Sequence, residues 1–201
     1  MSLIDNREEM TYAEYLKWDE GKRCEVLDGQ VISMTPARTP DHQRVLRELA
    51  VEFAMYLRGK ECETFTSPID VCLFDKKKTD INKIKNWVQP DLIVVCDENK
   101  IDNKRIIGPP DLAAEILSPS TAKNDRILKF NKYEEAGIKE YWIVDPYNQV
   151  IEVYLLEDGT YQRQGMFFRK DVIKVNILSD LEIDLKNVFL IEAEEEYEDK
   201  V

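Results

Sequence analysis

Two short apolar runs, residues 92–96 and 112–117, constrain this chain more than any other feature, because the second run carries a carboxylate. Both runs are almost continuous in apolar residues, which is typical of strands buried on both faces. Glu115 therefore lies in a segment that is otherwise alanine, isoleucine and leucine. Burying an ionised carboxylate there costs on the order of several kcal/mol unless a cation meets it. The sequence predicts a basic side chain or a metal ion beside Glu115.

The residues around these runs add more charged groups. Asp91 comes directly before the first run, and Ser118 or Ser120 is placed to cap a helix that should end at Gly137. At about 100° per residue, one face of that helix collects the following residues: Ala122, Asp125, Lys129, Tyr133 and Ala136. Packing of this face would direct Lys129 inward. A solvated Lys129 is the alternative, because Ile127, Leu128 and Phe130 lie elsewhere on the helix.

The N-terminal part predicts a helix and a hairpin. Thr11 and Glu14 have the spacing of a capping box, which predicts a helix over residues 12–19. Asp28-Gly29 predicts a tight turn between strands at residues 24–27 and 31–34. Glu25 is thus a strand carboxylate, with either a functional role or an outward-facing charge beside Arg23.

A long amphipathic helix is predicted over residues 40–58, where Val45, Leu49, Phe53 and Leu57 recur every four residues. His42, the single histidine, lies in its first turn. We expect a surface or capping residue there rather than a metal ligand.

The other segments complete an α/β pattern. Further strands are predicted at residues 63–66, 69–74, 140–145 and 150–155, and short antiparallel strands follow to residue 185. The strand–helix–strand order from Glu115 to Tyr141 indicates a right-handed crossover between parallel strands. We expect one domain over residues 1–190 and a solvated acidic tail over 191–201.

The composition indicates the cellular compartment. No apolar run approaches the roughly 18 residues needed to cross a bilayer, and the N-terminus is charged where a signal peptide would be apolar. The chain is therefore expected to be cytoplasmic and not bound to a membrane. The four cysteines have no metal-ligand spacing and are expected to be reduced.

The formal net charge of −12 argues against sequence-blind attraction to nucleic acid, which depends on Lys and Arg. Basic residues nevertheless gather in the loops flanking the Asp91 strand: Lys76, Lys77, Lys78, Lys83, Lys85, Lys100, Lys104 and Arg105. This cluster is either a local positive rim or simply a solvated charged loop.

Asp91, Glu115 and Lys129 together form a recognisable combination of charges. Two carboxylates on neighbouring strands suit Mg²⁺ or Mn²⁺, which prefer hard oxygen ligands and keep several waters. Such an ion polarises a phosphodiester and acidifies water, and an ammonium group beside it orients that water or stabilises developing negative charge. The combination predicts a site for phosphodiester hydrolysis.

The chain also resembles a known family, described as putative restriction endonucleases, which is common in cyanobacteria and belongs to the PD-(D/E)XK nuclease superfamily. The resemblance extends from about residue 11 to 190 and includes residues 25–29. Its principal motifs are Pro90-Asp91, Glu115-Ile116-Leu117-Ser118-Pro119-Ser120-Thr121, Asp125, Lys129, Tyr133, Gly137 and Glu140-Tyr141-Trp142-Ile143-Val144-Asp145-Pro146.

The resemblance implies a restriction-endonuclease-like α/β core, with a central mixed β-sheet flanked by helices. It implies Asp91 and Glu115 as metal ligands, the backbone carbonyl of Ile116 as a third ligand, and Glu25 as an auxiliary acid. The superfamily pattern has a lysine two residues after the glutamate, where this chain has Leu117. In this family a lysine on the following helix takes over its role, and Lys129 lies at that position. The resemblance further implies a homodimer acting on DNA.

Two hypotheses follow. The first is a Mg²⁺-dependent DNA endonuclease in which Glu25, Asp91, Glu115 and Lys129 are catalytic. The second is a binding or assembly module that keeps the fold without turnover, in which Glu115 and Lys129 form a buried ion pair. Neither a recognition sequence nor a choice between DNA and RNA follows from the chain, because no base-reading motif is visible.

Overall fold

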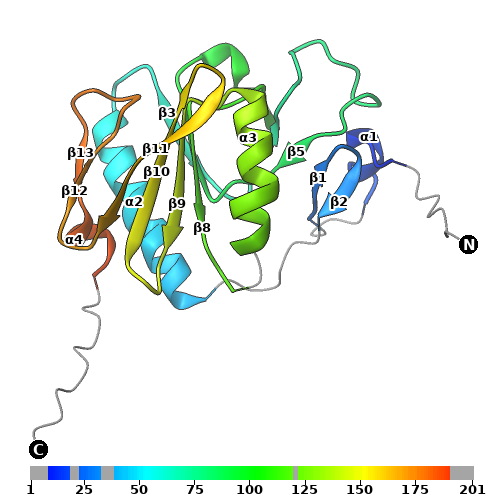
Figure 1. Ribbon diagram of the computed structural model, residues 1–201. Helices are drawn as coiled ribbons and strands as arrows, with labels where there is room; N and C mark the ends of the chain where they lie inside the picture. Colours follow the sequence, from blue (N-terminus) through cyan, green and yellow to red (C-terminus); the bar gives the residue numbers. More distant parts are fainter. Residues whose placement is uncertain (1–8, 19–22, 33–38, 120–121, 191–201) are drawn as a thin grey trace, which may run out of the picture.

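A six-stranded mixed β-sheet forms the centre of the computed structural model, which describes residues 9–18, 23–32, 39–119 and 122–190 (Figure 1). In spatial order its strands are β11 (Thr160–Phe168), β10 (Val150–Glu157), β9 (Glu140–Asp145), β8 (Leu112–Ile116), β6 (Leu92–Val95) and β3 (Glu63–Thr66). Strands β8 and β9 are parallel, as the predicted crossover requires, and all other neighbours are antiparallel. Both apolar runs are buried strands, as predicted.

One face of this sheet is covered by α2 (Pro40–Leu57), which begins after the N-cap Thr39. The amphipathic face of α2 packs on alternate residues of β6, β8 and β9. The same core includes β12 (Val172–Lys174), β13 (Glu182–Asp184) and α4 (Leu185–Val188).

The opposite face is covered by α3 (Phe130–Ala136) and by a second, five-stranded sheet. The order in that sheet is β2 (Gln30–Ile32), β1 (Glu25–Leu27), β5 (Trp87–Val88), β4 (Asp70–Cys72) and β7 (Arg105–Ile107). Figure 1 shows the β1–β2 hairpin beside α3. The expected α/β architecture, a central mixed sheet flanked by helices, is confirmed, and the second sheet brings the N-terminal strands close to α3.

The predicted local signals form where the sequence places them. Asp28 and Gly29 adopt φ of 51° and 75° in the two-residue turn between β1 and β2. The capping box of Thr11 and Glu14 begins α1 (Tyr12–Tyr15), which is shorter than the predicted helix. The chain turns after Tyr15, where the exposed Leu16 and Trp18 give a longer helix no apolar face to bury. Residues 19, 33–34 and 120–121 of the predicted elements, and the tail 191–201, lie outside the described residues.

The expectation of four reduced cysteines is wrong for one pair, because Cys62 and Cys96 form a disulfide. Cys62 directly precedes β3 and Cys96 directly follows β6, and the pairing of Glu63 with Val95 places the two cysteines opposite each other. Because the two cysteines are 34 residues apart along the chain, their proximity could not be predicted from local sequence. Cys24 and Cys72 are free and buried, as expected.

We find no helix among the described residues with the length and apolar character that crossing a membrane requires.

Candidate active site

Asp91, which directly precedes β6, lies opposite Glu115 of the adjacent antiparallel strand β8, because Leu92 pairs with Ala114. Glu115 lies two residues from Ala113 and therefore points, like Ala113, toward the face of the sheet that α3 covers. Asp91 is 2% exposed and Glu115 is 1% exposed, so the sequence argument for a buried carboxylate is confirmed. Asp91 Oδ2 accepts a hydrogen bond from the backbone N–H of Ile116 at 2.9 Å.

Lys129 reaches Glu115 from the helical segment before α3. Its Nζ lies 3.0 Å from Glu115 Oε1 and 3.7 Å from Asp125 Oδ1. The side chain is buried, whereas Ile127 and Leu128 are about half exposed, so the helix faces inward as predicted and the solvated alternative is wrong. Residues Asn124–Lys129 form a π-helical turn, a widened geometry that is frequent at functional sites.

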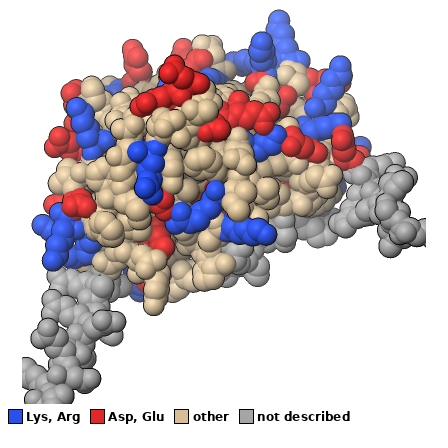
Figure 2. Space-filling model, in the orientation of Figure 1, with Lys and Arg blue, Asp and Glu red and all other residues tan. Residues whose placement is uncertain are grey.

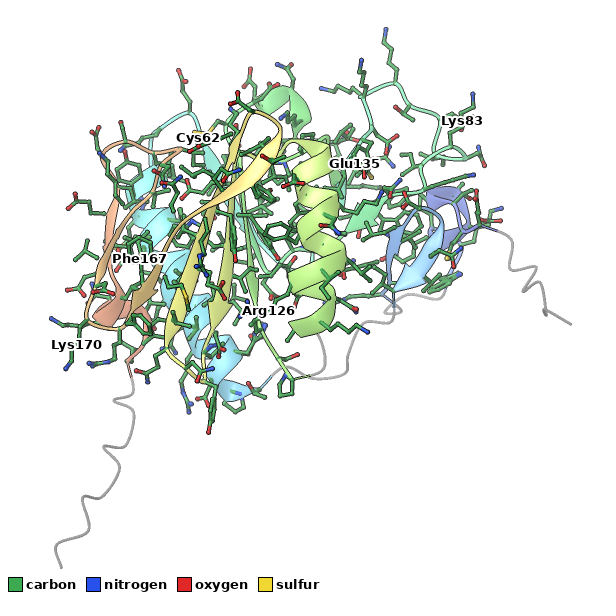
Figure 3. The ribbon with its side chains drawn as sticks, in the orientation of Figure 1. Cys62, Lys83, Arg126, Glu135, Phe167 and Lys170 are labelled. Atoms are coloured by element: carbon green, nitrogen blue, oxygen red, sulfur yellow. A yellow bond between two sulfur atoms is a disulfide. The ribbon has the colours of Figure 1, made fainter. Side chains whose placement is uncertain are left out.

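Glu25 joins the cluster from the other sheet. It lies on β1 and is buried, so the outward-facing alternative is wrong. Glu25 Oε1 lies 2.8 Å from Lys129 Nζ and accepts the backbone N–H of Gln89 at 2.8 Å. Lys129 is thus held by Glu25 from the five-stranded sheet and by Glu115 from the six-stranded sheet. In Figure 3 the labelled Arg126 marks the helical turn from which Lys129 extends.

Two tyrosines complete the hydrogen-bonding around the cluster. The hydroxyl of Tyr133 donates to Glu115 Oε1 at 2.6 Å, and that of Tyr141 donates to the backbone carbonyl of Asp125 at 3.0 Å. Sequence reasoning placed Tyr133 on the packing face but missed its role as a donor. Its spacing of four residues from Lys129 was the available signal.

His42 is buried against Asp91, contrary to the prediction of a surface or capping residue. Its Nε2 lies 3.2 Å from Asp91 Oδ2, and only 1% of the residue is exposed. Spacings of three, four and seven residues to Val45, Leu46 and Leu49 place His42 on the apolar face of α2, a helical period that could have revealed its burial. Because a carboxylate accepts, Nε2 is the donor in this contact, and Nδ1 has no hydrogen-bond partner within the described part of the chain.

The cluster holds more negative than positive charge, since Lys129 faces Glu25, Glu115 and Asp125. Burial raises the pKa of Glu115 well above its ordinary value; Lys129 offsets this only in part, and the neighbouring carboxylates add to it. Burial alone would lower the pKa of Lys129, but these carboxylates outweigh it and raise that pKa well above its ordinary value. The carboxylate of Glu115 therefore binds a proton more tightly than an ordinary glutamate does.

The residues assigned to a metal ion fit its chemistry. Mg²⁺ is typically held by one or two carboxylates with water completing its coordination. The carboxylates of Asp91 and Glu115, which lie opposite each other, provide hard oxygen donors of this kind, whereas the contact of Ile116 with Asp91 is made by its N–H. Within the described part of the chain no group of three or more His, Cys, Asp or Glu residues is arranged to hold a metal.

Comparison with known proteins identifies the family of the chain. The model of the Uma2 family, described as "Putative restriction endonuclease", matches residues 12–186. Uncharacterized protein slr1290 of Synechocystis sp. (strain ATCC 27184 / PCC 6803 / Kazusa) is 31% identical over 148 residues, which cover 72% of this chain and 73% of the relative. Uncharacterized protein sll1609 of the same organism is 26% identical over 159 residues, covering 77% and 85%.

A crystal structure from Anabaena variabilis, described as a "putative nuclease belonging to DUF820", shares the fold with a TM-score of 0.70 at 19% identity. The match covers 90% of this chain and 98% of that one. The chain therefore belongs to the Uma2 family of "putative restriction endonucleases".

Proposed function

We propose that this protein is a metal-dependent endonuclease that hydrolyses phosphodiester bonds of DNA, with Mg²⁺ or Mn²⁺ held by Asp91, Glu115 and the carbonyl of Ile116. The main support is the position of Lys129, which contacts Glu25 from one sheet and Glu115 from the other. Asp91 lies opposite Glu115. Family membership and the shared nuclease fold support the proposal.

A bound ion would supply Lewis-acid polarisation of the phosphodiester and would acidify water. Hydrolysis forms a bond from water oxygen to phosphorus, breaks the bond from phosphorus to the leaving oxygen, and transfers one proton to the leaving group. The ammonium of Lys129 is a hydrogen-bond donor that orients the attacking water or stabilises negative charge developing on the phosphate oxygens. Lys129 performs this role from a helix, where the superfamily pattern uses a strand lysine.

The other residues hold these groups in place. Glu25 fixes the ammonium of Lys129 through the 2.8 Å ion pair. Tyr133 orients Glu115, and His42 together with the backbone N–H of Ile116 orients Asp91. Side chains held by such secondary contacts keep the geometry that catalysis requires.

The direct test is nicking of supercoiled plasmid with Mg²⁺ or Mn²⁺. We expect cleavage by the wild-type chain and none by Asp91→Ala, Glu115→Gln or Lys129→Met. Glu140→Gln is the matched control, because Glu140 is also a buried strand carboxylate but lies at the start of β9, three residues before the partner of Glu115. Equal cleavage by wild type and all three site variants would refute the proposal.

A second candidate, a module without turnover, is favoured by one observation: Glu115 already has a cationic partner in Lys129. Thermal melts separate the two candidates. If the protein is an endonuclease, Mg²⁺ or Mn²⁺ should raise the melting temperature of the wild type but not of Asp91→Ala, and the wild type should also cleave the plasmid. Stabilisation by metal without cleavage would favour the module.

The choice of DNA and the homodimer remain parts of the proposal. Two copies related by a twofold axis would place two sites on the two strands of a duplex. The basic rim would contribute electrostatic attraction, and Figure 2 shows Lys and Arg side chains projecting from the corner formed by the loop between β4 and β5. Lys83, labelled in Figure 3, belongs to this loop. Light scattering on the full chain would establish the number of copies.

A further inference from the structure

A pocket of about 640 Å³ lies next to the carboxylate cluster without containing any of its members. One backbone hydrogen bond joins its wall to the cluster, and a second joins a residue next to its wall to the backbone of Asp91. Gln89 lines the pocket while its N–H donates to Glu25 Oε1 at 2.8 Å. Ser67, next to the lining residue Pro68, donates its N–H to the carbonyl of Asp91 at 3.0 Å. A ligand in this pocket would therefore lie beside the proposed catalytic residues.

Two buried polar atoms of the lining residues have no hydrogen-bond partner among the residues that the structure describes: Gln89 Oε1 and Arg105 Nε. The amide orientation of Gln89 is fixed because its nitrogen donates to Asp70 Oδ1 at 2.7 Å, and a carboxylate can only accept. Arg105 Nε lies 4.0 Å from Asp102, beyond hydrogen-bonding distance. Native proteins leave few buried groups unpaired. Two lining residues thus leave one acceptor and one donor unpaired in the wall of the pocket, and a ligand edge bearing both groups would complement them.

The walls combine aromatic and cationic groups. Tyr15 is held rigidly by stacking on Trp87, with ring centroids 5.4 Å apart and planes at 27°. Phe65 provides a second aromatic lining residue. Arg23 and Lys104 are exposed at the pocket, where the lining cations outnumber the lining carboxylates although the whole chain is strongly acidic.

We propose that this pocket binds one unpaired nucleotide of the DNA strand that occupies the proposed active site. Its base lies against Tyr15 or Phe65, its donor and acceptor edge meets Gln89 and Arg105, and its phosphate lies near Arg23 and Lys104. Every base has an aromatic face, and every base presents both donors and acceptors once it is unpaired. The base must be unpaired, because pairing in a duplex occupies that edge. This inference rests on the proposed endonuclease function.

The test measures binding separately from cleavage. A fluorescein-labelled single-stranded DNA of about 12 nucleotides is titrated with the full chain in EDTA at constant salt, and fluorescence anisotropy is recorded. We expect tighter binding of this strand than of the same sequence as a blunt duplex. Stacking on an aromatic residue contributes about 1–3 kcal/mol, so Tyr15→Leu should weaken binding about fivefold or more.

Lys104→Ala, at an exposed position, should also weaken binding of the single strand. Lys83→Ala is the matched control, because Lys83 is an exposed lysine of the basic rim that does not line the pocket. Equal losses for these two lysine variants would show non-specific attraction and overturn the pocket. Binding of deoxynucleoside monophosphates to the chain, with no binding of the strand, would overturn it in favour of a free nucleotide.

Cross-linking gives a readout that needs no variant. Irradiation of the wild-type chain with a strand containing 5-iododeoxyuridine should yield adducts at Tyr15 or Phe65, and adducts only outside the pocket would overturn the proposal. The plasmid nicking assay distinguishes failure of the pocket proposal from failure of the endonuclease proposal. Nicking without pocket adducts removes the pocket alone, whereas pocket adducts without nicking remove the catalytic function alone.

Discussion

Lys129 Nζ lies 2.8 Å from Oε1 of Glu25, and this contact joins the helical segment before α3 to a strand of the second sheet. The two residues are 104 positions apart by their numbering and come from elements with unrelated local signals. The same ammonium lies 3.0 Å from Glu115 on the central sheet. One cation therefore fixes the relative positions of both sheets and the helix at the point where the proposed chemistry occurs.

Replacing Lys129 by methionine should abolish nicking and destabilise the fold. The substitution leaves Glu25, Glu115 and Asp125 without their shared cation, and removing one partner of a buried ion pair costs about 3–5 kcal/mol. Denaturant unfolding measures this loss. Lys129→Arg, which keeps the charge, should recover much of the stability.

Lys132→Met is the matched control on the same helix. Lys132 pairs with Asp28 and Glu135, which are both exposed, so its loss should cost about 1 kcal/mol or less. If Lys132→Met and Lys129→Met were equally destabilising, the buried cluster would not be the dominant electrostatic contact of this helix.

The single histidine gives a direct spectroscopic prediction. We expect long-range ¹H–¹⁵N spectra to show one imidazole with its proton on Nε2, because Asp91 Oδ2 accepts at 3.2 Å. His42→Ala should lower the free energy of unfolding by about 1–3 kcal/mol, since the buried carboxylate loses a donor. Arg44→Ala, at an exposed position on α2, is the control and should have little effect. A proton on Nδ1 alone would contradict the contact.

Cysteine labelling tests the disulfide against the expectation of four thiols. Burial raises the pKa of both Cys24 and Cys72 to about 12, so neither should react with iodoacetamide in the native protein at pH 8. Unfolding without reductant should expose two reactive thiols, and unfolding with reductant should expose four. Mass spectrometry counts the adducts. Four adducts without reductant would show that Cys62 and Cys96 are reduced.

The sequence predicted those parts of the site that rest on local patterns. Two apolar runs placed Asp91 and Glu115 on buried strands, and helical spacing turned Lys129 inward with Tyr133. Contacts between distant elements were not accessible in this way. The burial of His42 depends on the packing of α2 against the end of β6, and the Cys62–Cys96 bond depends on the pairing of β3 with β6.

The unpaired polar atoms of Gln89 and Arg105 could not be predicted from the sequence either, because whether a polar atom has a partner depends on three-dimensional packing. Glu25 is intermediate between these cases. The local pattern placed Glu25 on a strand and left its direction open, and only the packing of the second sheet against the central sheet turns it toward Lys129.

Glu140 gives a prediction for pH, because it is buried at the opposite end of β9 from the candidate site. Burial raises its pKa above the ordinary value, and hydrogen bonds from Trp142, Ile177 and Asn176 oppose this only in part. The folded state therefore holds this proton more tightly than the unfolded state does. The contribution to stability is greatest below the unfolded pKa of about 4.3 and is lost as pH rises through the raised folded pKa.

Glutamine at position 140 does not titrate, so the comparison with Glu140→Gln isolates this contribution. The free energy of unfolding of the wild type, minus that of Glu140→Gln, should fall as pH rises from about 4 to 7. Chemical denaturation at several pH values measures the difference. Other titrating groups affect both proteins alike and cancel from it. A difference that rises with pH would mean that the hydrogen bonds to the ionised carboxylate outweigh the cost of its burial, and that the pKa of Glu140 is lowered in the folded protein.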